Sequence, residues 1–538
     1  MTRPYREVLA RQQTVLWGDR YARTMAQALF SAGLHNTPAT FQAYIRKPPF
    51  GGSYLVSARQ GIVGDWLKHQ WRFDEETLDF LREETVINPA TGQPQRLFTD
   101  DFLAMLADSK PELEIEALPE GGLAFPDEPV YRVTGPAWQA LWVETAITNS
   151  LNSQSLFATL ASRMVETAGG EPVTEYGLRR AHSIGGLAES RAAWIGGVAG
   201  TSNDQATFYY HIPASGTMAH AFVMFFDSEV EAFKSYLSAM PHNSVLLVDT
   251  FDTLNGVKNA ISAAQETGVK LKGVRLDSGD LASLSLEVRQ MLDAAGFTDT
   301  RIIASNNLDE YKISQMKAED KNAIEVWAVG TRLTTTDRDG TTPAEASLGA
   351  VYKLVNVAPG LSMEKLNHLR DEARQGKVVD LAAVRDRLKL SETMEKSSLP
   401  GELVPLRHYA ENGQLVGSTL LSGFAESPVD ALGRLTRDIV SVNKTNPGER
   451  IVYPKGSKAV LPLRPLAAFN ETIHEARTRA REELASLPEV YRQLVGAPRF
   501  PAGLDETLFT LWHKQAAAVR SKTHVRPSHI QGSLALKG

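Results

Sequence analysis

Short apolar runs alternate with helix-like segments between residues 172 and 357, and this alternation restricts the possible fold more than any other feature of the chain. Successive runs start roughly 23–30 residues apart, which is the length of a strand and a crossover helix leading to the next strand. Such units build a parallel sheet, so the pattern predicts an α/β fold, either a barrel or a doubly wound sheet. The runs are Val245–Val248, Lys272–Leu276, Ile302–Ser305, Val326–Val329 and Val351–Val355.

Polar residues and glycines stand at the ends of these runs. Asp249 follows the first run, Arg275 and Asp277 close the second, Asn307 comes after the third and Gly330 after the fourth. Barrels and doubly wound sheets bind their ligands at the carboxyl ends of the strands. We therefore expect these residues to share one site.

The composition excludes several classes of protein. The 538 residues include no cysteine, so disulfides, thiolate catalysis and cysteine-ligated metal centres are ruled out. A net charge of −6 gives no electrostatic footprint for nucleic acid. The densest apolar run, His220–Phe226, is too short to cross a membrane, and the first residues lack the apolar region of a secretory signal. We expect a cytoplasmic protein with no nucleic-acid or membrane partner.

Common nucleotide and metal motifs are missing from the sequence. It contains no Walker A motif, no GxGxxG after a predicted strand and no HExxH. A P-loop nucleotidase, a Rossmann dinucleotide site and a zincin-type metal site are therefore not predicted.

The segment Gly273–Asp280 is the sharpest local motif. An apolar strand runs directly into Arg275, Asp277 and Gly279 and then into a helix. A helix N-terminus accepts an anion, an arginine binds phosphate with two N–H groups and a carboxylate accepts hydrogen bonds from sugar hydroxyls, which together suit a phosphorylated sugar. The alternative is an ordinary capped helix, with a serine or aspartate as its N-cap and Asp277 paired to Arg275.

Two further segments carry candidate residues. Glu175–Arg180 joins a glutamate, a tyrosine, a glycine and two arginines, which suits a flat anionic ring or, alternatively, a solvated basic turn beside a core tyrosine. Ser215–His220 ends on a histidine that opens an apolar run. That histidine is either structural or, if Asp249 fixes its tautomer, a reactive base. The sequence leaves both alternatives open.

Taken in chain order, many segments resemble those of the nicotinate phosphoribosyltransferase family, over about residues 17–407. A single such segment is weak evidence, whereas the ordered set is specific. The segments are Gly18–Tyr21 with Thr24-Met25, Phe41–Lys47, Phe125-Pro126 with Gly135-Pro136, Asn152–Ser155, Glu175–Arg180, Gly216–His220, Asp249-Thr250, Arg275–Asp280, Ser305–Glu310, Gly330–Thr334, Val351–Val355, Lys389–Glu392 and Leu399–Gly401.

The resemblance implies an α/β architecture. An irregular (β/α) barrel of the type II phosphoribosyltransferase kind carries the site, and a mixed α/β domain is built from both chain ends. The implied division is 1–139 for the first part of the mixed domain and 140–357 for the barrel. Residues 358–388 form a helical insertion, and residues 389–538 complete the mixed domain with a helical extension and a basic tail. The family works as homodimers whose sites are shared between subunits.

The resemblance also implies a reaction. Nicotinate attacks C1 of 5-phosphoribosyl 1-pyrophosphate, giving nicotinate mononucleotide and pyrophosphate for NAD salvage. Family members couple this transfer to hydrolysis of ATP, a co-substrate, through a phosphohistidine. The matching histidine is His220, oriented by Asp249. Mg²⁺ is expected on the pyrophosphate, with no metal bound directly by side chains.

The other family positions divide between the two substrates. On the nicotinate side, Tyr176 matches the stacking aromatic residue and Arg179 the nearby arginine, with Tyr21 of the partner subunit on the other face of the ring. The phosphoribose and pyrophosphate positions are Arg46, Arg275, Asp277, Gly279, Asn307, Gly330, Thr331 and Lys389.

Ser202 bears on the choice of substrate. The related nicotinamide phosphoribosyltransferases carry an aspartate after a Gly-Thr step, which would repel a carboxylate, whereas the run here is Gly200-Thr201-Ser202-Asn203. We therefore predict nicotinate. The alternatives are transfer to nicotinamide and a nucleotide-binding barrel without catalysis. Two positions depart from the family, since Asn307 stands where many relatives have an acid and Glu402 where basic residues are usual.

Overall fold

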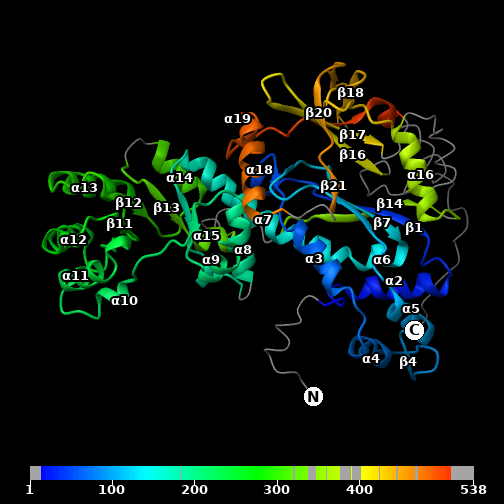
Figure 1. Cartoon of the computed structure of the whole chain (residues 1–538), viewed down its shortest axis with the longest axis horizontal. Coiled ribbons are helices and arrows are strands. Elements are labelled where there is room, and N and C mark those ends of the chain that lie inside the picture. Colours follow the sequence, from blue (N-terminus) through cyan, green and yellow to red (C-terminus); the bar gives the residue numbers. More distant parts are fainter. Residues whose placement is uncertain are drawn as a thin grey trace, which may run out of the picture.

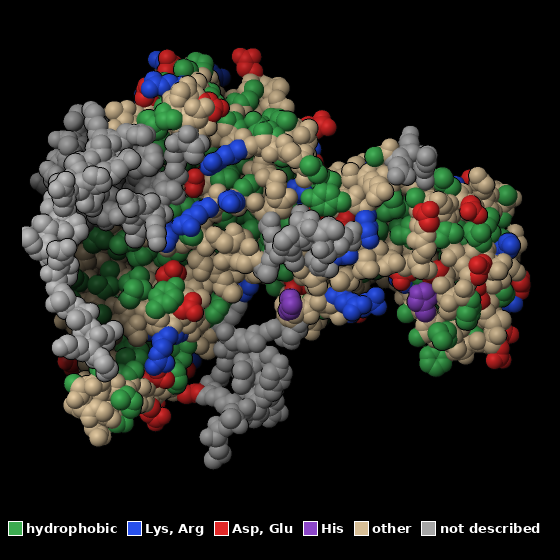
Figure 2. All heavy atoms as spheres, turned by 180° about the vertical axis from the view of Figure 1, so that it is seen from behind, with side chains coloured by type: hydrophobic (Ala, Val, Ile, Leu, Met, Phe, Trp, Pro, Cys, Tyr) green, Lys and Arg blue, Asp and Glu red, His purple; other side chains and the backbone are tan. Residues whose placement is uncertain are grey.

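The chain folds into two lobes of unequal size (Figure 1). The computed structural model describes residues 14–510 except 183–184, 319–321, 337–346, 359, 376–388, 391–401, 423–424, 444–445 and 467–470. Three helices stand where the lobes meet: α7 (Glu144–Ala168), α8 (Gly185–Ile195) and α18 (Ile473–Ser486). Seen from behind, the lobes join across a narrower waist, and basic and histidine side chains gather along the lower side of the smaller lobe (Figure 2).

The smaller lobe is built on a curled, parallel half-barrel sheet, as predicted. Every neighbouring pair of its strands is parallel, so all six carboxyl ends point to the same edge. A further parallel bridge joins Thr201 of the last strand to Ala214. In spatial order the strands are β10 (Val245–Leu247), β11 (Gly273–Leu276), β12 (Arg301–Ala304), β13 (Val326–Val329), β8 (Val173–Glu175) and β9 (Gly200–Thr201).

Several helices of this lobe begin at side chains that accept hydrogen bonds from the free N–H groups of the first turn. Ser228, Asp252 and Asp280 cap α11, α12 and α13 in this way, and Gly268 ends α12 in the left-handed conformation at φ 68°. The helices of this lobe are α9 (Asp204–Tyr210), α10 (His220–Val223), α11 (Glu229–Ala239), α12 (Thr253–Thr267), α13 (Leu281–Ala294), α14 (Glu310–Ala318) and α15 (Thr331–Thr335).

One predicted strand belongs elsewhere. The run at Val351–Val355 forms β14 (Val351–Val357), but β14 pairs antiparallel with β1 (Pro38–Tyr44) in the larger lobe and does not extend the parallel sheet. The spacing in sequence matched a strand–helix unit, yet a buried strand has the same apolar composition in either kind of sheet. The prediction was therefore right about the strand and wrong about its partner.

Residues from both chain ends build the larger lobe, which holds two six-stranded sheets. The division at 139, 357 and 388 stays a prediction. The first sheet contains β15 (Lys389–Leu390), β14, β1, β7 (Pro129–Pro136), β5 (Glu114–Ala117) and β21 (Arg464–Pro465). The second contains β19 (Arg450–Tyr453), β18 (Ile439–Val442), β22 (Ala502–Asp505), β17 (Leu415–Ser422), β16 (Leu403–Tyr409) and β20 (Lys458–Val460).

The strand β22 corrects a second expectation. The helical extension predicted within residues 389–538 does contain α18 and α19 (Glu489–Arg492), but Ala502–Asp505 is a strand that pairs parallel with β17. Four residues are too few to show a two-residue period in sequence. The part of this prediction beyond residue 510 and the basic tail lie outside the described residues.

The remaining elements cover the sheets of the larger lobe. Among them α16, within the predicted insertion, is helical as expected and buries Leu366 and Arg370; residues 376–388 of that insertion lie outside the described residues. No helix in the described part of the chain is long and apolar enough to span a membrane. The elements that cover the sheets of the larger lobe are α2 (Arg20–Ser31), α3 (Gln60–Gln70), α4 (Glu75–Glu83), α5 (Asp100–Asp108), α6 (Ala137–Trp142), α16 (Met363–Arg374), β2 (Leu55–Val56), β6 (Leu123–Ala124), β3 (Thr85–Ile87) and β4 (Pro94–Arg96).

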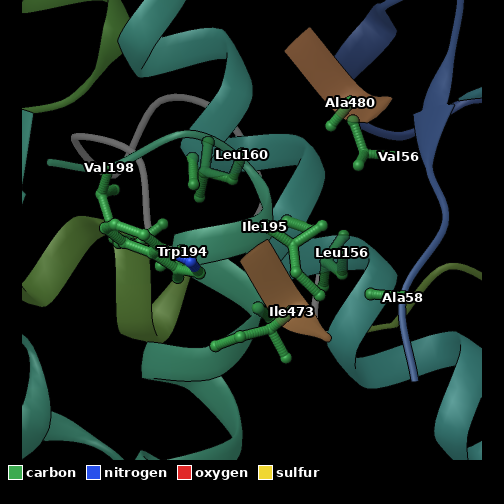
Figure 3. Close-up of a cluster of buried hydrophobic side chains, with 14 of the residues drawn as sticks. Val56, Ala58, Leu156, Leu160, Trp194, Ile195, Val198, Ile473 and Ala480 are labelled. Carbon is green, nitrogen blue, oxygen red and sulfur yellow. The ribbon is translucent and has the colours of Figure 1, made fainter. Parts of the chain in front are cut away.

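One continuous apolar cluster holds the lobes together. Figure 3 shows the part of it where Leu156 of α7, Ile195 of α8 and Ile473 of α18 come together, and it draws Val56 of β2 near Ala480 of α18. Complete burial of a side chain of this size contributes about 1.5–3 kcal/mol. Because helices of both lobes contribute, we infer that the parallel sheet keeps a fixed place on the larger lobe.

The larger lobe contains a fully buried ion network centred on Glu402. Its carboxylate accepts hydrogen bonds from Arg132 of β7 at 2.7 Å and from Arg370 of α16 at 3.0 Å. Burial alone would raise the pKa of Glu402, but the two guanidinium groups outweigh it and hold the pKa below its usual value. Glu402, which departs from the family pattern, therefore joins an early strand to α16 by charge.

Replacing Glu402 by alanine is expected to lower the free energy of unfolding by about 3–5 kcal/mol, because two guanidinium groups would stay buried without their shared carboxylate. Chemical denaturation measures this loss. The exposed Glu287→Ala change on α13 is the control and should cost less than about 0.5 kcal/mol. Equal, small effects of the two changes would contradict the network's role.

Candidate active site

The carboxyl edge of the parallel sheet brings together most of the predicted site residues. Asp249, Asp277 and Gly330 follow β10, β11 and β13 within two residues, while Tyr176 and Ser202 directly follow β8 and β9. Because the strands are parallel and in register, these positions lie side by side along one edge. This is the arrangement that the alternation of runs and helices predicted.

A histidine and two aspartates form the centre of this edge. The His220 side chain is held between Thr250, whose hydroxyl lies 3.2 Å from Nδ1, and Asp277, whose Oδ2 lies 3.7 Å from Nε2. The ring is 41% exposed, so a ligand can reach it. The Thr250 hydrogen bond orients the ring through Nδ1, and Asp277 lies within ion-pair distance of Nε2, so the ring presents a defined nitrogen to a ligand.

Asp249, the second aspartate, contacts the loop that carries Asp277, and within the described residues no hydrogen bond joins it to the His220 ring. Its carboxylate accepts hydrogen bonds from the Asp277 N–H at 3.0 Å and from the Ser278 hydroxyl at 2.6 Å. Thr250 and Asp277 make the contacts with His220 that the sequence assigned to Asp249. Asp249 therefore fixes the loop that carries Asp277 and orients His220 only through it.

Asp277 and Arg275 stand on the same strand end without pairing to each other. The Asp277 carboxylate also accepts the hydroxyl of Ser305, which follows β12, and Asp280 caps α13. Arg275 donates to the Met218 carbonyl at 3.4 Å, and its Nε is buried without a hydrogen-bond partner. The alternative prediction of an ordinary capped helix is right about the N-cap and wrong about an ion pair between Arg275 and Asp277. Both side chains therefore remain available for a ligand.

Tyr176 and Gly330 lie together where β8 and β13 end. The Tyr176 hydroxyl lies 3.1 Å from that of Ser215, and its N–H donates to Val329 at 2.6 Å. A Cβ on Gly330 would come within 3.0 Å of the Tyr176 carbonyl, so the two segments pack at glycine distance. Thr331 then begins α15, and its N-terminal N–H groups face this edge.

Four predicted positions are exposed. Arg179 lies in the short helix after Tyr176 (Leu178–Arg180), while Gly279 and Asn307 adopt positive φ of 79° and 48° in the loops after β11 and β12. Ser202 is exposed beyond β9. Side chains at such positions can meet a ligand with little rearrangement.

Three predicted residues lie away from this group. Tyr21 is on α2 and Arg46 follows β1, both in the larger lobe, and within the described part of the chain no hydrogen bond or ion pair links either to His220 or Asp277. The side chain of Lys389, in β15, lies outside the described residues. Partial burial, reinforced by the charge of Glu144, raises the pKa of Tyr21 to about 12, so its phenol stays neutral.

The structure gives contacts to residues that lie within the predicted segments but were not among the predicted site residues. Thr250, Ser278 and Ser305 bind the central aspartates and histidine, and Glu175 binds the loops beside Tyr176. Their position at the end of a strand or within three residues of it was a usable signal. Within the described residues, no group of three or more histidines, aspartates and glutamates is arranged to hold a metal ion.

Comparisons with known proteins agree with this geometry. The chain is 38% identical to the nicotinate phosphoribosyltransferase of Bacillus subtilis over 94% of this chain and 95% of that protein. It is 30% identical to the enzyme of that name from Dictyostelium discoideum over 93% and 88%. The crystal structure of human nicotinic acid phosphoribosyltransferase covers 92% of this chain at 25% identity with a TM-score of 0.72, and 99% of its own length is matched.

A solved nicotinate-nucleotide pyrophosphorylase from Pyrococcus furiosus shares the fold at a TM-score of 0.58 and 20% identity, over 90% of this chain and 99% of its own. The curled parallel sheet, with polar side chains at its carboxyl edge, has the fold of the type II phosphoribosyltransferases. The nicotinate phosphoribosyltransferase N-terminal domain model matches residues 16–152, and the model of that family matches residues 172–361. The chain belongs to the nicotinate phosphoribosyltransferase family.

The carboxyl group of Glu189 lies close to Glu175, beneath the carboxyl edge of the parallel sheet. Glu189 of α8 is buried, and its Oε2 has no hydrogen-bond partner. Burial, reinforced by the charge of Glu175, raises the pKa of Glu189 to about 7, although a backbone hydrogen bond at His182 opposes the shift. The group therefore titrates near neutral pH in the folded protein and near its ordinary value in the unfolded chain.

Glu189→Gln tests this shift. Between pH ~4.5 and ~7 the folded protein binds more protons at Glu189 than the unfolded chain, so wild-type stability falls as pH rises through that window. Relative to the glutamine variant, the wild type should lose about 1–2 kcal/mol of unfolding free energy across it. Denaturation at several pH values measures the difference, with Glu287→Gln as the exposed control. A pH-independent difference would show that Glu189 titrates normally.

Proposed function

We propose that this chain transfers the phosphoribosyl group of 5-phosphoribosyl 1-pyrophosphate to nicotinate, in the cytoplasm, as a step of NAD salvage. Family membership supports the reaction, and one observation carries it. His220, Asp277 and Thr250 meet on the carboxyl edge of the parallel sheet, beside Tyr176 and the glycine-initiated helix α15. A nucleotide product needs an acceptor for ribose hydroxyls, a phosphate site and a surface for a flat ring, and this edge offers all three.

The phosphoribose is expected to lie across the ends of β11, β12 and β13. Asp277 would accept hydrogen bonds from the ribose hydroxyls, and Arg275, whose Nε has no partner, would donate to phosphate. The N–H groups at Gly330 and Thr331 would bind the 5′-phosphate at the start of α15. Gly279 and Asn307 belong to the loops that surround this position. We also propose that Arg46 and Lys389 bind the pyrophosphate as cations.

Transfer at C1 passes through a state with oxocarbenium character, so the main task is to hold the ring nitrogen in line and to stabilise the leaving pyrophosphate. Mg²⁺ carried on the pyrophosphate would offset its charge. The Asp277 carboxylate, which is 29% exposed, could accept a hydrogen bond from a water of the shell of such an ion. The side chains orient the reactants and supply no nucleophile for this step.

ATP is proposed to act through His220. An unprotonated ring nitrogen attacks the γ-phosphorus, an N–P bond forms, the bond to ADP breaks and ADP leaves. Asp277 then lies close enough to stabilise the ring when it carries positive charge. Water later releases phosphate from the histidine, which returns the site to its starting state.

Nicotinate is proposed to stack on Tyr176, with its carboxylate near Arg179 and Ser202. We further propose a homodimer in which Tyr21 of the partner subunit covers the other face of the ring. Exposed apolar side chains support such an interface, since Phe225 after α10 and Phe251 after Thr250 are 86% and 72% exposed beside the site. Tyr21 itself is 45% exposed on α2.

One assay tests the proposed function as a whole. Purified protein is incubated with 5-phosphoribosyl 1-pyrophosphate, Mg²⁺ and one of nicotinate, nicotinamide or quinolinate, with and without ATP, and pyrophosphate is measured. Nicotinate should give the fastest release and ATP should increase it. Release that prefers either of the other two acceptors would refute the proposal.

His220→Ala should abolish the stimulation by ATP while slow ATP-independent transfer remains, because no protein nucleophile acts in the transfer itself. The same assay measures both rates. Thr250→Val, which removes one hydrogen bond of the ring but keeps the ring, should weaken the stimulation only in part. Equal loss of both rates in a folded His220→Ala protein would argue against a phosphohistidine.

Ser202→Asp should shift the ratio of kcat/KM values from nicotinate toward nicotinamide by about tenfold or more, because two like charges ~4 Å apart near a protein surface repel by several kcal/mol. Ser202→Asn introduces a side chain of the same size as aspartate but without its charge. It should leave the ratio of kcat/KM values close to that of the wild type. If the aspartate leaves the ratio unchanged, Ser202 does not face the carboxylate of the substrate.

A further inference from the structure

Glu175 lies at the end of β8, directly before the stacking tyrosine, and is fully enclosed at 3% exposure. Its carboxylate accepts three hydrogen bonds from three segments. Oε1 accepts the N–H of Gly177, and Oε2 accepts the hydroxyls of Ser190 on α8, at 2.9 Å, and of Thr201 at the end of β9. Among the residues that the structure describes, no lysine or arginine forms an ion pair with it.

These contacts join the two loops on the nicotinate side. The Gly177 N–H belongs to the turn that carries Tyr176 and Arg179, whereas Thr201 directly precedes Ser202. The Glu175 carbonyl also accepts the Ser202 N–H at 2.9 Å. One residue therefore holds both the turn of the stacking aromatic and the position that faces the carboxylate in the proposed complex.

The turn has no room to move away from Glu175. A Cβ on Gly177 would lie 1.9 Å from the Thr334 hydroxyl and 2.9 Å from Glu175 Oε1, so the backbone is packed between α15 and the carboxylate. On the other side Asn203, also fully buried, donates to the Ser190 hydroxyl at 3.1 Å. Both loops are thus tied to one buried polar network.

A buried carboxylate without a cation is costly unless its hydrogen bonds are satisfied. An uncharged residue could fill the same space without this cost. Glu175 instead accepts hydrogen bonds from loops whose outer sides face the ligand edge. Burial, reinforced by the charge of Glu175, raises the pKa of the neighbouring Glu189. A group placed in this way sets loop geometry more than it adds stability.

We infer that Glu175 is a positioning residue for the acceptor substrate, which holds the Tyr176–Arg179 turn and the Thr201–Ser202 edge at the spacing that nicotinate requires. The inference rests on the proposed function. It assigns no contact with the reacting atoms. Within the described residues, the phosphoribose side, built on Asp277 and the Gly330–Thr331 segment, shares no hydrogen bond with Glu175, although Thr334 of α15 packs against the Gly177 turn.

Glu175→Gln and Thr201→Val test the inference. The first keeps the shape but replaces an acceptor by an N–H₂ group, and the second removes the Thr201 hydroxyl. Each should raise the KM for nicotinate about tenfold, the effect of losing one hydrogen bond to a charged group, with the KM for 5-phosphoribosyl 1-pyrophosphate changed by about twofold or less. Thr201→Ser keeps the hydroxyl and should behave like the wild type.

Ser285→Ala is the matched control, since Ser285 is a fully buried hydroxyl in the same lobe that accepts the Ala323 N–H at 2.9 Å away from the site. It should lower the unfolding temperature without separating the two KM values. If Thr201→Val changes both KM values by the same factor, or neither, Glu175 is only structural and the inference is wrong. If the Glu175→Gln protein does not fold, the comparison of Thr201→Val with Thr201→Ser is enough to test the inference. Failure of the proposed function looks different, because the wild type would then release no pyrophosphate with nicotinate.

Discussion

The parallel hydrogen-bond ladder of the smaller lobe is the constraint on which the rest depends. A parallel pair places the carboxyl ends of both strands at one edge, and five such pairings in a row place six strand ends there. Residues far apart in the chain, such as Glu175 and Asp277, therefore come to lie along one line. The polar side chains at these ends satisfy one another: Ser305 donates to Asp277, and Asp249 accepts the Asp277 N–H. The aligned strand ends thus bring into one site residues that no single loop could place together.

The larger lobe affects this edge indirectly, through packing between the lobes. Its first sheet combines strands from early and late parts of the chain, and the buried Arg132–Glu402–Arg370 network joins an early strand to α16, so that early and late segments depend on each other. The apolar cluster of α7, α8 and α18 joins that lobe to the helices under the site. Since α8 carries Ser190 and Glu189, the packing between the lobes also bears on the buried polar network around Glu175. The site and the scaffold are thus parts of one packing arrangement.

Much of this could be predicted from the sequence, because the signals were local and periodic. The strands at Val245, Lys272, Ile302 and Val326 were marked by apolar runs of the right spacing, and the residues after them were marked by their polarity. The partner of a strand was not visible, which is why β14 was assigned to the wrong sheet. Contacts between side chains were not visible either. Asp249 and Thr250 are adjacent in sequence, and only the direction of each side chain decides that Thr250 reaches His220. Glu189, in the middle of a helix, gives no signal at all until its burial is known.

The central claim is that the carboxyl edge of the parallel sheet binds the sugar phosphate. The most direct measurement is a crystal structure with nicotinate mononucleotide bound. The account predicts ribose hydroxyls within hydrogen-bond distance of the Asp277 carboxylate, the 5′-phosphate at the N–H groups of Gly330 and Thr331, and the pyridine ring against Tyr176. A nucleotide bound elsewhere, with this edge in contact with solvent alone, would contradict it.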